Sequence, residues 1–303
     1  MIYDLTLKIG YEYPSAAADA RHVLRVRPRE EPGQSVERTV LTVTPRPDEH
    51  HAETDFFGNP VDAIAYHRPH TALKVEMRAR VALARRSIDL ADTPTRCTLA
   101  DLAFLSRESD GASPIHFLAA SRRAAPLAAL SAYAGEILAD ASVGAGILAL
   151  ADRIKADFAY VPGSTGVGTT VAEAFDSRRG VCQDFSHVMI AGLRANGIPA
   201  GYVSGFLRTD PPPGRPRLEG ADAMHAWVTA WLGPDCGWVG FDPTNGVVAA
   251  DDHVSVAVGR DYDDVAPVAG VFVTAGTQKT FHSVDVVPLP AAPAAEDRPA
   301  RPQ

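Results

Sequence analysis

The sequence predicts an α+β fold, in which a β-rich, sandwich-like N-terminal domain is followed by a core of one helix packed on an antiparallel sheet. Two observations indicate this fold. The first ~85 residues alternate apolar and polar side chains in short runs that end at proline, glycine or asparagine, which is typical of antiparallel strands. Later, a helical pattern that begins at Cys182 is followed by strand-like runs over 200–208, 223–231 and 238–242. A helix followed by successive strands is an α+β order.

The composition is that of an ordinary globular protein. With 303 residues, 46% apolar and 22% charged, the chain can form two domains and a sizeable core. Its formal charge of −8 argues against nucleic acid as a partner, because phosphate binding needs a basic face. No apolar run is long enough to span a membrane, and the N-terminus lacks the regions of a signal peptide. Cys97, Cys182 and Cys236 have no disulfide-framework spacing, so we expect a cytoplasmic protein without a membrane partner.

Changes of pattern divide the chain into four parts. We expect the β-rich domain over residues 1–85, a linker over 86–115, the core over 116–289 and a disordered tail over 290–303. The tail is rich in proline and alanine and cannot bury enough apolar surface to fold.

The N-terminal domain contains strand-like runs but no evident site. The runs cover residues 3–9, 22–27, 39–44 and 73–81. Arg25, Arg27 and Arg29 alternate and could form a basic stripe, although we favour a solvated strand face. The histidines of this domain have no cysteine or carboxylate cluster at ligand spacing, so we expect no metal site here.

Helices are expected between the two strand-rich regions. One runs over 126–138 from a proline in its first turn, and a second covers 145–160. Thr169 or Thr170 can cap a short helix over 171–175, whose first turn contains a glutamate.

Three segments after the Cys182 helix have simple structural interpretations. Residues 210–217 contain too many prolines for a helix or an inner strand, so we expect a surface loop. Residues 270–274 and 281–287 indicate a hairpin that closes the core.

Cys182 is the first candidate site residue. Apolar residues follow it at steps of three and four, and Asn196-Gly197 followed by Pro199 is a stop signal. Cys182 is therefore expected in the first turn of a buried helix. The unpaired N–H groups and partial positive charge at a helix N-terminus favour a thiolate over a thiol. A lone cysteine is more often a buried apolar residue, so the case for catalysis depends on the two segments that follow.

His225 and Asp242 are the other two candidate residues. His225 lies near the start of the strand-like run over 223–231, and Asp242 ends the next run at an Asp-Pro turn. Cysteine, histidine and aspartate in this order suit a thiol-imidazole-carboxylate triad. His225 would take and return the proton of Cys182, and Asp242 would orient the imidazole and stabilise the imidazolium.

These motifs resemble the transglutaminase-like superfamily of papain-type thiol enzymes. The resemblance lies in Gly180–His187, Met224–Trp227 and Phe241–Thr244. Residues 24–29 and 55–59 also resemble the N-terminal region of the bacterial branch. The resemblance implies a papain-like core with Cys182 as nucleophile, His225 as base and Asp242 as orienting residue.

Several reactions remain open at such a site. Cys182 would attack an amide or peptide carbonyl of a peptide or protein substrate and form a thioester. Water would then give a peptidase or amidase, and a lysine-like amine would give a transglutaminase. A non-catalytic peptide-binding module with the same fold is the alternative from another class. The backbone N–H of Cys182 is the first candidate to bind the oxyanion, and Gln183 and Tyr160 are weaker candidates.

No cofactor or metal is expected. Cys182 and His187 lie five positions apart, so they do not share a helix face well, and we expect His187 to pack inside or to support the site indirectly. The carboxylates at 251, 252, 261, 263 and 264 lack the glycine-punctuated pattern of a calcium loop. We expect Cys97 and Cys236 to take no part in the chemistry.

Overall fold

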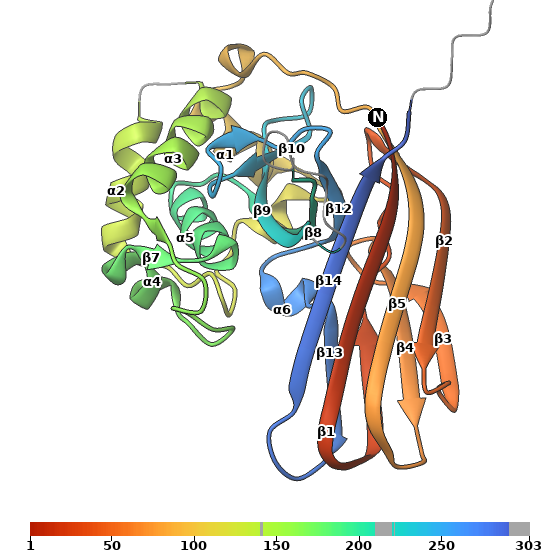
Figure 1. The fold of residues 1–303 in the computed structure, drawn as a ribbon. Helices are drawn as coiled ribbons and strands as arrows, with labels where there is room; N and C mark the ends of the chain where they lie inside the picture. The colour runs from red at the N-terminus through yellow and green to blue at the C-terminus, as the bar shows by residue number, and fades with distance from the viewer. Residues whose placement is uncertain (140–141, 210–219, 221, 291–303) are drawn as a thin grey trace, which may run out of the picture.

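The computed structural model describes residues 1–139, 142–209, 220 and 222–290, and arranges them around two large antiparallel sheets (Figure 1). This confirms the predicted α+β class. No helix in the described ranges is long and apolar enough to cross a membrane. The predicted surface loop over 210–217 and the predicted tail beyond Pro290 lie outside the described residues.

The first sheet, here called the long sheet, has the strand order β2-β5-β1-β4-β3, and β13 and β14 also pair with β1. Its strands are β1 (Ile2–Leu24), β2 (Gln34–Thr44), β3 (Glu49–Thr54), β4 (Pro60–Tyr66), β5 (His70–Leu83), β13 (Val268–Val273) and β14 (Lys279–Pro288). Figure 1 shows β1, β5 and β14 in front of β3, β4 and β13, so β1 belongs to both layers of a sandwich-like unit. Side chains from both layers share one apolar cluster, as the strand alternation predicts.

The last two strands correct one prediction. β13 and β14 do not form a hairpin with each other in the core; both pair with β1 of the long sheet. β14 lies along Tyr3–Glu12 and β13 along Ala18–Leu24. The register of β1 shifts between these two stretches, so the 23-residue strand pairs with β14 along its first part and with β13 along its second. Strands β13 and β14 therefore complete the sheet that the N-terminal strands begin. The domain limits expected from the sequence stay a prediction.

The second sheet, here called the core sheet, has the order β11-β10-β9-β8-β12. Its strands are β8 (Ala200–Leu207), β9 (Ala223–Trp231), β10 (Trp238–Asp242), β11 (Val247–Val248) and β12 (His253–Gly259). The helical elements are η1 (Leu90–Asp92), α1 (Arg96–Leu105), η2 (Pro114–Phe117), α2 (Ala128–Leu138), α3 (Val143–Asp157), α4 (Val171–Ser177), α5 (Cys182–Ala195) and α6 (Tyr262–Val265). Helix α5 packs against β8 and β9, and α2, α3 and α4 pack around it (Figure 1).

Local contacts order the segment between α4 and α5. Thr170 caps α4 in a reciprocal pair with Glu173, as predicted. Arg178 then adopts a left-handed backbone conformation, with its guanidinium 4.0 Å from the ring centre of Phe175. The next two residues form β7 (Arg179–Gly180), which pairs in parallel with β6 (Ala159–Tyr160). The chain therefore reaches Cys182 from a fixed direction.

Buried amides hold the two sheets together. The side chain of Gln34, at the start of β2, donates to the carbonyl of Ser255 on β12 and accepts from its N–H, both at 2.8 Å. Asn59 makes the same pair of bonds with Val258, also at 2.8 Å. Strand β12 is at the edge of the core sheet and has no neighbouring strand on one side. Each amide bonds to the backbone groups on that side, which would otherwise be buried without partners.

The arginines after β1 correct a second prediction, because they do not form a solvated strand face. They lie beyond the end of β1, and each is paired. Arg25 binds Asp55 at 3.1 Å, Arg27 binds the buried Asp62, and Arg29 donates to Asn59 at 2.7 Å. These contacts support the segment that carries the Asn59 link.

Candidate active site

Cys182 is the first residue of α5, as predicted, and a tight local structure holds it there. Asp184 accepts the backbone N–H of Val181 at 2.8 Å and the hydroxyl of Thr165 at 2.6 Å. A Cβ at Gly180 would lie 2.7 Å from the Asp184 side chain, so only glycine allows this approach. Asp184 also complements the positive end of the helix dipole. The start of the helix is thereby fixed, and Cys182 remains partly exposed to a cavity.

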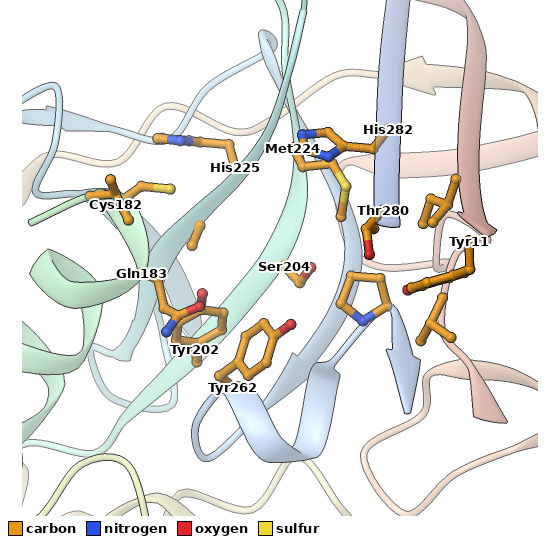
Figure 2. Close-up of a pocket in the computed structure, with 15 residues that line it drawn as sticks. Tyr11, Cys182, Gln183, Tyr202, Ser204, Met224, His225, Tyr262, Thr280 and His282 are labelled. Atoms are coloured by element: carbon orange, nitrogen blue, oxygen red, sulfur yellow. The ribbon is translucent and has the colours of Figure 1, made fainter. Parts of the chain in front are cut away.

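The structure brings all three predicted site residues together. His225 is the third residue of β9 and Asp242 the last of β10, and these strands are neighbours. The imidazole Nε2 of His225 donates to Oδ2 of Asp242 at 2.8 Å. The imidazole also lies near the Cys182 thiol, which contributes to raising the pKa of His225. Figure 2 shows the Cys182 and His225 side chains next to each other at one end of the cavity.

Electrostatics favours the protonated form of this histidine. Burial opposes the charge on His225, but its interactions with Asp242 and Cys182 outweigh this effect and raise the pKa of His225 to about 9. Burial alone would likewise raise the pKa of Asp242, yet its bonds to His225 and His253 and the attraction of His225 hold it well below the ordinary value. At neutral pH the arrangement therefore favours an imidazolium on His225 beside the carboxylate of Asp242.

Asp242 has further partners that the sequence did not reveal. Its Oδ1 accepts the backbone N–H groups of Thr244 at 2.9 Å and Asn245 at 3.2 Å, and its Oδ2 accepts the Asn245 amide at 2.6 Å. His253, the first residue of β12, donates to the same Oδ2 at 3.1 Å. The Asp-Pro-Thr-Asn turn explains the first three bonds from local sequence. No local signal places His253, because its position depends on the pairing of β12 with β8.

His225, Asp242 and His253 also form the one cluster in the described residues whose ligand atoms lie close enough to hold a metal, all within 4.8 Å of one another. However, both imidazoles bond directly to one carboxylate oxygen, at 2.8 and 3.1 Å. A cation would need the nitrogen lone pairs where these N–H groups now point. The arrangement is therefore better described as a hydrogen-bonded network than as a metal site.

The cavity beside Cys182 has a volume of about 310 Å³ and lies between the two sheets. The core side contributes Gln183, Tyr202, Ser204, Met224 and Tyr262, and the long sheet contributes Ile9, Tyr11, Thr280 and His282 (Figure 2). Among the described residues, no aspartate, glutamate, lysine or arginine lines it. The sequence predicted no site residues in the N-terminal domain, because only the pairing of β1 with β14 brings this wall to the cavity.

The remaining candidates occupy supporting positions. His187 is buried against the Tyr202 ring and accepts the backbone N–H of Tyr262 at 3.2 Å. Burial lowers its pKa to about 4, so it is neutral. Burial and the nearby Cys182 raise the pKa values of Tyr160 and Tyr202. Both phenols therefore stay protonated near the thiol and can donate hydrogen bonds.

The other two cysteines lie apart from this cavity. Cys97 is an exposed residue of α1, and Cys236 lines a different cavity, beside Trp238. Neither is among the residues around Cys182.

Comparisons with known families agree with this architecture. The family described as the bacterial transglutaminase-like N-terminal region matches residues 3–82. The transglutaminase-like superfamily matches residues 131–243, which include the three candidate site residues.

Similar proteins come mainly from mycobacteria. An uncharacterized protein of Mycobacterium leprae is 33% identical over 286 residues, which cover 92% of this chain and 96% of that protein. An uncharacterized protein of Mycobacterium tuberculosis is 49% identical over 144 residues, and this match spans 46% of each chain, about half the length of that relative. A protein-glutamine gamma-glutamyltransferase of Pseudomonas aeruginosa is 37% identical over 102 residues, which cover 32% of this chain and 15% of that protein.

One solved structure shares the whole fold. A protein of Cytophaga hutchinsonii, described as a candidate cysteine protease, superposes with a TM-score of 0.73 at 23% identity. The alignment covers 96% of this chain and 92% of the other. The likeness extends over both sheets, so the combination of long sheet and core sheet is a shared architecture.

Proposed function

Because the chain belongs to the transglutaminase-like superfamily and carries the N-terminal region of its bacterial members, we propose that it is a thiol enzyme that transfers an acyl group from a neutral amide. Cys182 is the proposed nucleophile, His225 the acid and base, and Asp242 the group that orients His225. The single observation that supports this most is the arrangement of the three side chains. His225 bonds to Asp242 at 2.8 Å and faces the thiol at the start of a helix.

In the first half of the proposed reaction, the Cys182 thiolate attacks the carbonyl carbon of the amide. The oxygen becomes an oxyanion, and the backbone N–H of Cys182 at the helix start is oriented to bind it. The imidazolium of His225 gives its proton to the leaving nitrogen. The carbon–nitrogen bond breaks, an amine or ammonia leaves, and a thioester remains on Cys182.

In the second half, an acceptor resolves the thioester. His225, now neutral, takes a proton from water or from a primary amine as that group attacks the thioester carbonyl. The carbon–sulfur bond breaks, the thiolate returns, and the product is a carboxylic acid or a new amide. The Pseudomonas aeruginosa relative, named for glutamine acyl transfer, supports including amines among the acceptors to be tested.

The cavity supports a substrate without charge near the reacting carbonyl. A charged side chain would lose its hydration there without gaining an ionic partner, because the described part of the lining contains apolar and neutral polar groups apart from the histidines. A peptide or protein substrate would enter between the two sheets and contact Tyr11, Thr280 and His282 on the long sheet. We therefore propose that the long sheet forms part of the substrate site.

The test uses a library of glutamine-containing peptides, incubated with and without a labelled primary amine and analysed by mass spectrometry. Amine incorporation that is lost in Cys182→Ala would identify a transglutaminase. Cleaved or deamidated peptide without incorporation would identify a hydrolase. Peptide binding without any product, together with a Cys182 thiol no more reactive than a free one, would contradict the proposal and favour a non-catalytic binding module.

A further inference from the structure

We infer that His253 is a positioning residue for the proposed reaction, which donates the third hydrogen bond to Oδ2 of Asp242 and so limits how strongly that carboxylate holds His225. This inference rests on the proposed function, because it concerns the same proton transfer. It adds a fourth residue, contributed by β12, to the three on α5, β9 and β10.

The distances around Asp242 carry the argument. Its Oδ2 accepts from Asn245 Nδ2 at 2.6 Å, from His225 Nε2 at 2.8 Å and from His253 Nε2 at 3.1 Å. A carboxylate oxygen has about two lone-pair directions. Three donors must therefore share one oxygen, and each added donor weakens the hold on the others. Asp242 is fully buried, so water cannot take the place of a missing donor.

The surroundings of His253 fix the state in which it donates. Its Nδ1 accepts the backbone N–H of Ala250 at 3.4 Å, and its own backbone N–H donates to the Ala250 carbonyl at 3.0 Å. Because Nδ1 accepts this N–H, the nitrogen that donates to Asp242 is Nε2.

Trp227 keeps the two histidines at fixed positions. Its ring stacks against His225 at 6.1 Å, with 30° between the planes, and meets His253 edge-on at 5.1 Å. A Cβ at Gly205 would come within 2.5 Å of the indole, and one at Gly240 within 3.2 Å. Glycines at these two positions thus allow the indole to fill the space between the strands. The imidazole of His253, only 4% exposed, cannot turn away from Asp242 easily.

Other charged groups near His253 contact its backbone and not its ring. Arg85 donates to the His253 carbonyl at 3.0 Å and is itself paired with Glu31 at 3.0 Å. Asp251 accepts the backbone N–H of Arg85 at 3.1 Å. In the described part of the chain, the titratable groups that lie against this imidazole are Asp242, at 3.1 Å, and His225, with 6.1 Å between the ring centres.

Loss of the hydrogen bond from His253 should stabilise the imidazolium of His225. Without His253, Asp242 is a stronger acceptor for His225, and the imidazolium becomes more stable. A more stable imidazolium is a weaker acid, so it gives its proton to the leaving nitrogen less readily. His253 therefore keeps His225 acidic enough for its proposed role.

The experiment measures the rate of Cys182 alkylation by iodoacetamide from pH 4 to 10, with site-specific detection by peptide mapping. The alkylation rate changes in steps as the pH rises. The step at the higher pH, called the upper step, reports the loss of the His225 proton. His253→Leu should move that step upward by about half a pH unit or more. His253→Gln keeps an N–H near the position of Nε2 and should restore the wild-type step. Val256→Ala, a buried position on the same strand that packs in the apolar cluster of the long sheet, is the matched control for lost stability.

The outcomes separate this inference from the proposed function. If wild-type Cys182 reacts no faster than a free thiol at mildly acidic pH, the ion pair is absent and both fail. If the wild type shows the ion pair but His253→Leu leaves the upper step in place, His253 has only a structural role and the inference is wrong. A shift in His253→Leu that His253→Gln reverses and Val256→Ala does not produce supports it.

Discussion

Replacement of Asp242 by asparagine should change the proposed ion pair more than any other conservative substitution. The pKa of His225 lies near 9 instead of the usual 6.5, which corresponds to about 3 kcal/mol of stabilisation of its imidazolium. Asp242 and Cys182 share this contribution. Asparagine removes the charge and leaves at most one good acceptor oxygen for two imidazoles that now bond at 2.8 and 3.1 Å.

We expect Asp242→Asn to lower the upper step of the Cys182 alkylation profile by about one pH unit or more, because about half of that stabilisation is lost. Turnover of any substrate found in the peptide screen should fall by at least about tenfold, since about 1.5 kcal/mol of stabilisation of the imidazolium is lost. Asp252→Asn is the control, because that carboxylate contacts Tyr3 and Arg208 and is not part of the network. An unchanged upper step in Asp242→Asn would refute the electrostatic reasoning.

Three further predictions concern stability and local structure. The His225–Asp242 pair should stabilise the fold fully between about pH 3.8 and 6.5. This contribution should be lost as the pH rises through about 9 or falls well below 3.8. A melting-temperature difference between wild type and Asp242→Asn that is equal at pH 6 and pH 10 would argue against it. Gln34→Leu should lower the free energy of unfolding by about 2–4 kcal/mol, because it leaves backbone groups on β12 without partners, and an unchanged urea midpoint would show that the amide is dispensable. Gly180→Ala should displace Asp184 from the start of α5, cost about 1–2 kcal/mol and slow alkylation of the thiol, whereas Gly166→Ala, with open space around it, should change neither quantity.

The sequence predicted those parts of the site that depend on local pattern. The helix start at Cys182 follows from apolar spacing and a stop signal, and the strands that carry His225 and Asp242 follow from alternation and an Asp-Pro turn. Their order along the chain was enough to suggest that they meet. In the structure the three side chains lie together, and their catalytic role stays a prediction.

Long-range pairing explains what the sequence left undetermined. β14 joins β1 through partners such as Tyr3 and Pro288, which lie at opposite ends of the chain. The alternation of apolar and polar residues predicts which side of such a strand is buried, but not which strand it pairs with. The wall of the cavity on the long sheet could therefore not be predicted. The contact of His253 with Asp242 was not predicted for the same reason, because it depends on the register of β12.

The measurement that tests the central claim most directly is the rate at which iodoacetamide labels Cys182 at about pH 6, in the wild type and in His225→Ala. The exposed Cys97 lies in the first turn of α1, so it provides an internal reference for a thiol at a helix start in the same molecule. An activated pair predicts that Cys182 reacts much faster than Cys97 and that this advantage disappears in His225→Ala. Equal labelling of the two thiols in the wild type would contradict the account, because the Cys182 thiolate would then not be stabilised by His225.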